Sequence, residues 1–201
     1  MTLTITTPRI TLRVATLDDI DAIQAAKEAM WPILQKWMAW SSNDQASRDA
    51  TQAYVLSAID KAKNNDFYLH GFCKDTGKFI MATGINATDE GPSIFTTGYW
   101  VAKGFQGQGY ATEGTLACIY CTFSLFKAKK MTINYYADNM ASKRVIEKLG
   151  FTYLRTNKGA HTSFLDGTIM DVHQYEMTDP SVLPPLDVTW QYTPDETAHA
   201  P

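Results

Sequence analysis

The sequence predicts one mixed α/β (α+β) domain, in which helices flank a mostly antiparallel central sheet. Three extended runs follow one another with only tight turns between them, which is typical of an antiparallel meander. A glycine-containing turn then joins the last run to an amphipathic helical run. The 201 residues, 45% hydrophobic and 19% charged, are enough to bury a sizeable core.

The N-terminal part is expected to form a strand and then a helix. Residues 10–14 alternate apolar and polar side chains and include β-branched types, which favours a short strand. Thr16, with the carboxylate of Asp19 three residues later, resembles a capping box. The apolar spacing after it predicts a helix that continues toward Met30.

Trp31-Pro32 is expected to break or restart this helix, because proline lacks the N–H that an interior helical position donates. The apolar residues between positions 33 and 40 have helical spacing again. Asn43 or Asp44 is expected to cap a further helix that ends near residues 64–65.

The meander occupies the middle of the chain. Its predicted strands cover residues 67–73, 79–85 and 94–102. Turn-forming residues at positions 75–78 and 89–92 separate them. Short turns of this kind place consecutive strands side by side and antiparallel.

Helices and strands alternate in the second half. Apolar residues at i, i+3, i+4 and i+7 predict an amphipathic helix over residues 112–126, followed by a buried strand over 131–136. Asn139 is placed to cap a short helix that ends at Gly150. The last expected elements are strands over residues 151–154 and 169–177, separated by a loop that carries His161, Asp166 and Gly167.

Composition argues against several classes of protein. The formal net charge is −3 and no block of five like charges occurs, so nucleic acid is not an expected partner. No apolar run approaches the roughly 20 residues of a membrane helix, and the Thr-rich start does not resemble a signal peptide, so a cytoplasmic protein with no membrane association is expected. Cys118 and Cys121 have C-x-x-C spacing but fall inside the predicted helix, which favours core thiols over a metal or redox site.

Residues 178–201 form a Pro-rich C-terminal extension that holds five of the eight prolines. This composition is typical of an extended appendage rather than a core element. Residues 188–192 are nevertheless suited to dock as an extended segment on this chain or on a neighbour. The extension therefore leaves both a monomer and a homodimer open.

The turn at residues 106–111 is the feature most informative about function. A strand, a glycine turn and a helix start in succession form an anion-binding device, because the first helical N–H groups have no partner within the helix. A P-loop motif is absent. A dinucleotide fingerprint is also incomplete, since Thr112 stands near its third glycine and no acidic residue occurs from Gly114 to Ala137.

The pattern Q-x-x-G-x-A at 106–111 resembles the acyl-CoA pyrophosphate motif of the GNAT N-acetyltransferases. Further segments are similar to the branch of that family that contains the ribosomal-protein alanine and serine N-acetyltransferases. They are residues 8–13, 34–37, 98–101, 111–113, 138–142 and 149–151. The resemblance implies the GNAT acyl-CoA N-acyltransferase fold over residues 8–177, with acetyl-CoA as cosubstrate.

The resemblance also implies which residues bind acetyl-CoA. Backbone N–H groups of the glycine turn would hold the pyrophosphate, and the strand around Trp100 would pair with the pantetheine arm. The residues expected to contact the cosubstrate are Trp100, Val101, Gln106, Gly107, Gln108, Gly109, Tyr110, Ala111, Asn139 and Ser142.

Two residues are expected to take part in catalysis. The resemblance implies that Ser142 helps to protonate the departing CoA thiolate. Relatives often carry a Glu just before the G-Y-W segment, where this chain has Thr96-Thr97, and no carboxylate lies between Ser93 and Gln106. The base is therefore a water held by Thr96 or Thr97, a carboxylate from elsewhere, or unnecessary for an altered substrate.

Aromatic and titratable residues near the expected site are interpreted mainly as packing. His173 has the alternation of a packed strand residue, Asp171 either pairs locally or touches substrate, and His161 lies in a loop that can rim the acceptor site. Trp37 and Trp40 are candidates to line the acceptor pocket.

The expected function is acetyl transfer from acetyl-CoA to a primary amine, by direct attack in a ternary complex. The amine is either a protein N-terminal α-amine or that of a small molecule. A non-catalytic acyl-CoA-binding or regulatory module is the alternative, because the usual carboxylate is missing.

Overall fold

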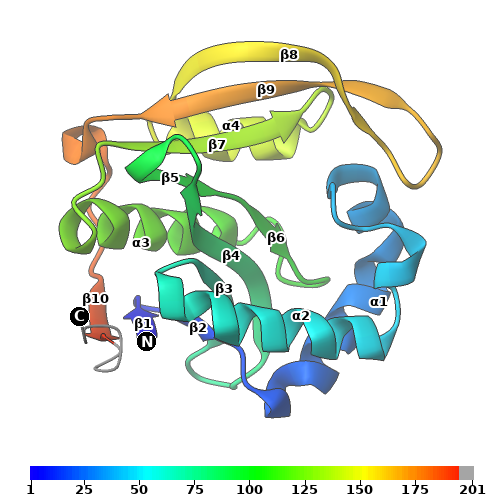
Figure 1. Cartoon of the computed structure of the whole chain (residues 1–201), viewed down its shortest axis with the longest axis horizontal. Coiled ribbons are helices and arrows are strands. Elements are labelled where there is room, and N and C mark those ends of the chain that lie inside the picture. The colour runs from blue at the N-terminus through cyan, green and yellow to red at the C-terminus, as the bar shows by residue number, and fades with distance from the viewer. Residues whose placement is uncertain (195–201) are drawn as a thin grey trace.

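The computed structural model describes residues 1–194, whose ten strands form one sheet with helices on both faces (Figure 1). The strands are β1 Thr2–Thr6, β2 Ile10–Val14, β3 Phe67–Cys73, β4 Phe79–Thr88, β5 Gly91–Thr97, β6 Tyr99–Val101, β7 Lys130–Tyr136, β8 Thr152–Thr162, β9 Ile169–Met177 and β10 Thr189–Thr193. The helices are α1 Ile20–Trp37, α2 Arg48–Lys61, α3 Tyr110–Leu125 and α4 Met140–Lys148. Short 3₁₀ turns cover Leu17–Asp19, Asn43–Gln45, Ala62–Asn64 and Pro180–Val182.

The strand order confirms the expected sheet. It is β10-β1-β2-β3-β4-β5-β7-β9-β8, with β6 paired to β4 beside β5. Within residues 1–194 the single parallel ladder joins β5 to β7, and the others are antiparallel. The meander prediction for β3, β4 and the strand after them is therefore correct.

Alternation along the strands gives the sheet two faces, and helices cover each of them. The His70 ring of β3 makes an edge-to-face contact with the Tyr54 ring of α2, so this face of the sheet carries α1 and α2. Thr83 of β4 faces the thiol of Cys118 in α3, so the other face carries α3 and the larger core. The helices α1 and α2 lie together in Figure 1, away from α3 and α4.

Three boundaries differ from the sequence prediction. Helix α1 is continuous through Pro32. Proline cannot donate to the carbonyl four positions earlier, which belongs to Glu28, but both residues lie on the exposed side of the helix, while Met30 and Leu34 anchor the buried side. Helix α2 is capped by Ser47, whose hydroxyl accepts from the Ala50 N–H at 3.1 Å. The third meander strand is divided at Gly98 into β5 and β6.

The last hairpin is also longer than predicted. Strand β8 runs to Thr162, so His161 belongs to a strand and not to the loop, and its side chain is buried. The backbone bulges where β8 pairs with β9, which keeps the strands together beyond the expected turn.

The first and last strands close one edge of the sheet. Strand β1, which the sequence pattern did not predict, pairs with β10, and Leu3 lies opposite Tyr192. Trp190 and Tyr192 pack against the main core, so the expected extended segment docks on this chain. Residues 195–201 of the predicted extension lie outside the described residues. None of the helices in the described part is long and apolar enough to span a membrane.

His70 is a polar residue in an apolar layer. Its side chain is completely buried between Tyr54 and Phe79, and neither ring nitrogen has a hydrogen-bond partner of normal geometry. Burial lowers the pKa of His70 to about 4, against weaker opposing effects of Asp19 and of the Tyr68 backbone.

We expect His70→Leu to raise the melting temperature at pH 7 by roughly 2–4 °C, because it removes an unpartnered buried polar group worth about 1 kcal/mol. The wild type should also lose stability as the pH falls from about 6.5 toward about 4, since only the unfolded chain binds the His70 proton in that window. Calorimetric melting as a function of pH measures both effects.

His173→Leu is the matched control, because its Nδ1 already has a partner in the Thr156 hydroxyl at 2.8 Å. It should lower the melting temperature. A His70→Leu protein that melts earlier than wild type, with an unchanged acid limb, would refute the prediction.

Candidate active site

The site is built where two neighbouring strands part. Strand β5 pairs with β7 as far as Thr97 and Ile133. Beyond this point β6 stays on β4, with Tyr99 opposite Thr83, whereas β7 continues along β9. No ladder joins β6 to β7 in the described residues, and Figure 1 shows the two strands diverging. Strand backbone on both sides of the gap is therefore available to a ligand.

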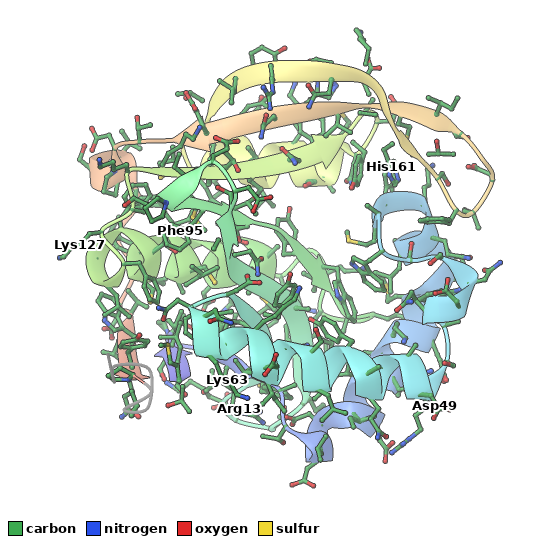
Figure 2. All side chains as sticks on the ribbon, viewed as in Figure 1. Arg13, Asp49, Lys63, Phe95, Lys127 and His161 are labelled. Carbon is green, nitrogen blue, oxygen red and sulfur yellow. The ribbon has the colours of Figure 1, made fainter. Side chains whose placement is uncertain are left out.

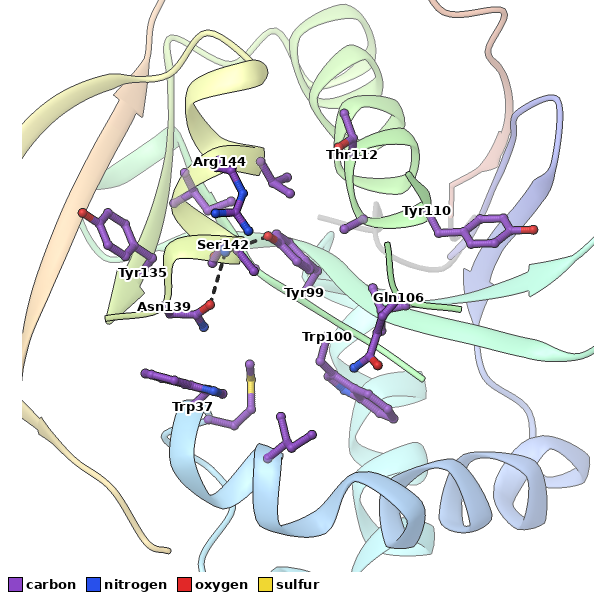
Figure 3. Close-up of a pocket in the computed structure, with 18 of the residues that line it drawn as sticks. Trp37, Tyr99, Trp100, Gln106, Tyr110, Thr112, Tyr135, Asn139, Ser142 and Arg144 are labelled. Carbon is purple, nitrogen blue, oxygen red and sulfur yellow. Dashed lines mark hydrogen bonds between the residues drawn. The ribbon is translucent and has the colours of Figure 1, made fainter. Parts of the chain in front are cut away.

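A cleft of about 630 Å³ fills this gap (Figure 3). Strands β6 and β7, the last turns of α1 and the first turns of α3 and α4 all contribute to its walls. Two helix N-termini thus face one open space between parted strands. That combination suits an elongated ligand with an anionic group at one end.

The anion cradle is the turn that leads into α3. Gly107 and Gly109 have φ angles of 73° and 84°, which glycine adopts without strain. The first intrahelical bond runs from the Glu113 N–H to the Gly109 carbonyl at 3.0 Å. The N–H groups of the three preceding residues therefore have no partner within the helix and carry its positive dipole end.

Arg9 braces this cradle from the loop before β2. Its guanidinium pairs with the Glu113 carboxylate at 2.6 Å and donates to the Gln108 carbonyl at 3.0 Å. It also lies over the Tyr110 ring, 4.3 Å from the centroid. Thr7 donates its hydroxyl to the same carboxylate at 2.7 Å. Arg9 thus fixes the turn and neutralises an acidic side chain close to the anion site.

The start of α4 brings polar groups to the middle of the cleft. The Asn139 side-chain oxygen accepts from the Ser142 N–H at 3.2 Å, so Asn139 caps the helix as predicted. The Ser142 hydroxyl accepts from the Tyr99 hydroxyl at 3.3 Å, across the gap from β6. Burial raises the pKa of Tyr99, so this phenol stays protonated and can act as a donor.

Most predicted cosubstrate residues meet in this one cleft. The predicted residues that line it are Trp100, Val101, Gln106, Gly107, Gly109, Tyr110, Ala111, Asn139 and Ser142. Gln108 is not among the lining residues, because its side chain turns back to donate to the Gly104 carbonyl at 2.6 Å.

Thr96, the other predicted catalytic residue, lines neither this cleft nor the neighbouring one. Its hydroxyl donates to the Thr132 carbonyl at 3.3 Å on the adjacent strand. Its place in the strand suggested a water-binding role, but the hydroxyl is already used within the sheet.

A second cleft, of about 420 Å³, adjoins the first under α1 and α2. The two clefts share the residues Met38, Gly98, Tyr99, Trp100 and Tyr136. Trp37 lines the first cleft and Trp40 the second. The two clefts therefore meet at the chain segment around Gly98.

The remaining candidate residues have structural partners. His173 stacks on Tyr135 with ring centroids 4.8 Å apart. Asp171 accepts from Lys158 at 2.6 Å, and this contact is the main reason that the pKa of its carboxyl is lowered. His161 stacks on Tyr136 with centroids 3.9 Å apart, beside the second cleft.

Sequence reasoning missed three contributors, namely Arg9, Glu113 and the Tyr99 hydroxyl. The alternation of β6 places Tyr99 on the face opposite Trp100, toward α4, and that signal was available in the sequence.

The cysteines Cys118 and Cys121 are free, buried thiols of the core, and burial raises their pKa values. Among residues 1–194 no group of three or more His, Cys, Asp or Glu side chains is arranged to hold a metal.

Comparison with known proteins agrees with this geometry. The sequence model of the acetyltransferase (GNAT) domain matches residues 9–152. YkkB of Bacillus subtilis (strain 168), an uncharacterised protein, is 36% identical over 84 residues, which are 41% of this chain and 49% of that protein. The match thus spans about half of that relative's length.

Solved structures show the same fold. RimL, a ribosomal L7/L12 alpha-N-protein acetyltransferase in complex with coenzyme A, superposes with a TM-score of 0.78 at 22% identity, over 87% of this chain and 97% of its own. The ribosomal-protein-S5-alanine acetyltransferase of Vibrio fischeri gives 0.78 at 18%, over 90% and 99%. The microcin C7 self-immunity acetyltransferase MccE, in complex with acetyl-CoA and AMP, gives 0.75 at 21%, over 86% and 93%.

Gly109→Val should weaken acetyl-CoA binding at least about tenfold, because a β-branched side chain is strained at a φ of 84° and its Cβ would lie 3.4 Å from the Arg9 guanidinium. Calorimetric titration of the folded variant measures the affinity. Gly77→Val is the control, since it has a similar φ of 68° in a turn with nothing within 4 Å. Equal affinity losses in the two variants would contradict a local effect at the cradle.

Arg9→Met should weaken CoA binding about tenfold, because it leaves the Glu113 carboxylate uncompensated beside the anion site. In a Glu113→Gln background the same change should cost less than about threefold, since no such carboxylate remains. Titration of CoA into the wild type, both single variants and the double variant gives the coupling. Identical losses in the two backgrounds would show that Arg9 acts only as a packing residue.

Proposed function

Because the chain belongs to the GNAT acetyltransferase family, we propose that it transfers the acetyl group of acetyl-CoA to a primary amine in a ternary complex. One observation carries this proposal above all. The gap between β6 and β7 opens directly beside an anion cradle, so a single ligand can reach both. CoA has the matching chemistry, with a pyrophosphate at one end and an amide-bearing arm that ends in the thioester.

In this arrangement the pyrophosphate lies on the N–H groups that precede Glu113, and the pantetheine amides pair with strand backbone in the gap. The residues that support this pose are those of the glycine turn, β6 and the start of α4. Arg9 keeps the turn in shape and offsets the charge of Glu113, without itself lining the cleft.

The reaction needs a proton donor for the sulfur. The amine nitrogen bonds to the thioester carbon, the carbon–sulfur bond breaks, and the thiolate takes a proton. Ser142 is suited to give that proton, and the Tyr99 hydroxyl, which already donates to Ser142, replaces it. The proton lost by the nitrogen passes to water, and water returns a proton to Tyr99. A backbone N–H of β6 is suited to stabilise the oxyanion.

The acceptor belongs to the class of primary amines. The structural neighbours named above are acetyltransferases of the ribosomal proteins L7/L12 and S5 and one of microcin C7 self-immunity. The similarity of fold therefore supports amine acetylation as the reaction. The identity of the acceptor has to be inferred from the shape and chemistry of this chain's own clefts.

A free-thiol release assay over a panel of amines tests the reaction. Ser142→Ala should lower kcat about tenfold to a hundredfold while the KM for acetyl-CoA changes less than about threefold, because the lost hydroxyl acts on the leaving group. Ser57→Ala, on the exposed side of α2, is the control and should match wild type. Binding of CoA without thiol release from any amine would instead favour a non-catalytic acyl-CoA-binding module.

A further inference from the structure

The second cleft is placed to hold the acceptor of the proposed reaction. It adjoins the first cleft at Gly98, Tyr99 and Trp100, the segment beside which the thioester would lie. A ligand in the second cleft would thus present one end to the reacting carbon while its body stayed under α1 and α2. Its volume, about 420 Å³, suits a small molecule.

The floor of this cleft is open where a side chain is missing. A Cβ added to Gly98 would meet no atom within 4 Å. Gly98 lines both clefts, so this open space lies where the two clefts meet. A ligand can therefore approach the strand backbone closely at the point where the two clefts meet.

Aromatic rings form much of the walls. The rings that line the cleft belong to Trp40, Tyr54, Tyr68, His70, Tyr99, Trp100 and Tyr136, and the buried His70 is neutral because burial lowers its pKa. Trp40 is 43% exposed, so its ring has a free surface next to the cleft. Flat apolar groups pack well against such walls through offset and edge-to-face contacts.

No charged group in the cleft is free to pair with a ligand. Among the described residues, the lining includes no Asp, Glu or Arg. Lys27 lines it, but its ammonium donates to the carbonyls of Gln45 and Ser47 and to the Thr51 hydroxyl. A charged body would lose its hydration there and gain no partner, which is costly.

The same apolar surroundings favour the neutral form of the acceptor amine, which is the nucleophile. An ammonium that enters the cleft is desolvated, which lowers its pKa and favours release of its proton to water. The neutral amine then attacks the thioester carbon as the carbon–sulfur bond breaks. This effect explains how the site can work without the carboxylate that is absent before Gly98.

The β8–β9 hairpin contacts the end of α1 beside the cleft. The Phe164 N–H donates to the Gln35 carbonyl at 2.9 Å, and His161 stacks on Tyr136 in the cleft wall. Figure 2 shows His161 next to the end of α1.

We propose that this pocket selects a small primary amine with an uncharged, flat apolar body, in preference to a polypeptide N-terminus. This inference rests on the proposed acetyl transfer and names its acceptor class. Three properties of the acceptor can be varied separately in an experiment, namely the flatness, the charge and the length of the amine-bearing molecule.

The test compares kcat/KM by thiol release for 2-phenylethylamine, 1,4-diaminobutane, β-alanine and a hexapeptide with a free N-terminus. 2-Phenylethylamine should exceed each of the others at least about tenfold. Trp40→Ala should lower kcat/KM for 2-phenylethylamine at least about fivefold, and Gly98→Ala should do the same by filling the open floor.

Leu56→Ala is the matched control, because this α2 residue is 48% exposed and does not line the cleft. It should retain the wild-type preference among amines. The calorimetric affinity for CoA should change less than about twofold in Trp40→Ala, which separates acceptor binding from cosubstrate binding.

The outcomes distinguish the two levels of the proposal. Turnover that favours the hexapeptide or a charged amine overturns the pocket assignment and leaves acetyl transfer intact. If no amine releases thiol although CoA binds, acetyl transfer fails, and titration of 2-phenylethylamine into the CoA-saturated protein decides the pocket. If 2-phenylethylamine binds and Trp40→Ala weakens that binding, the pocket assignment is supported. If 2-phenylethylamine does not bind, the pocket assignment is refuted.

Discussion

The loss of pairing between β6 and β7 after Thr97 is the constraint on which the rest of the structure depends. No backbone hydrogen-bond ladder joins these two strands in the described residues, which leaves backbone groups without protein partners. The sheet tolerates this because β4 holds β6 on one side and β9 holds β7 on the other. Both α3 and α4 begin at the opening, so the helix N-termini and the unpaired strands face the same space.

The fold could be predicted from sequence wherever the signal is local. Alternation in β3, the turn residues between β3 and β4, the apolar spacing in α3 and the glycine after α4 each concern residues within a few positions of one another. Helix α3 is nevertheless buried at most positions from Gly114 to Thr122, and not along one face only as predicted. The pairing of β1 with β10 joins the two ends of the chain, and no local pattern reports it. Pro32 misled because its effect depends on exposure, which only packing decides.

The same distinction applies to the candidate site. The glycine turn and the Asn139 cap have short-range signatures, and both lie in the cleft. The Arg9–Glu113 contact joins residues 104 positions apart, so it depends on how β2 and α3 pack. Thr96 was chosen for its place in the strand, yet the partner of its hydroxyl, the Thr132 carbonyl, comes from the neighbouring strand, which the sequence did not place.

The union of β1 with β10 also bears on how the protein is made. Thr2–Thr6 leave the ribosome well before their partner on that side, Thr189–Thr193, because more than 180 residues separate the two strands. Until then β1 keeps one unprotected edge, while the site-forming strands between β3 and β9 are already available to pair. A nascent chain that stalls before residue 189 therefore exposes a strand edge that favours aggregation.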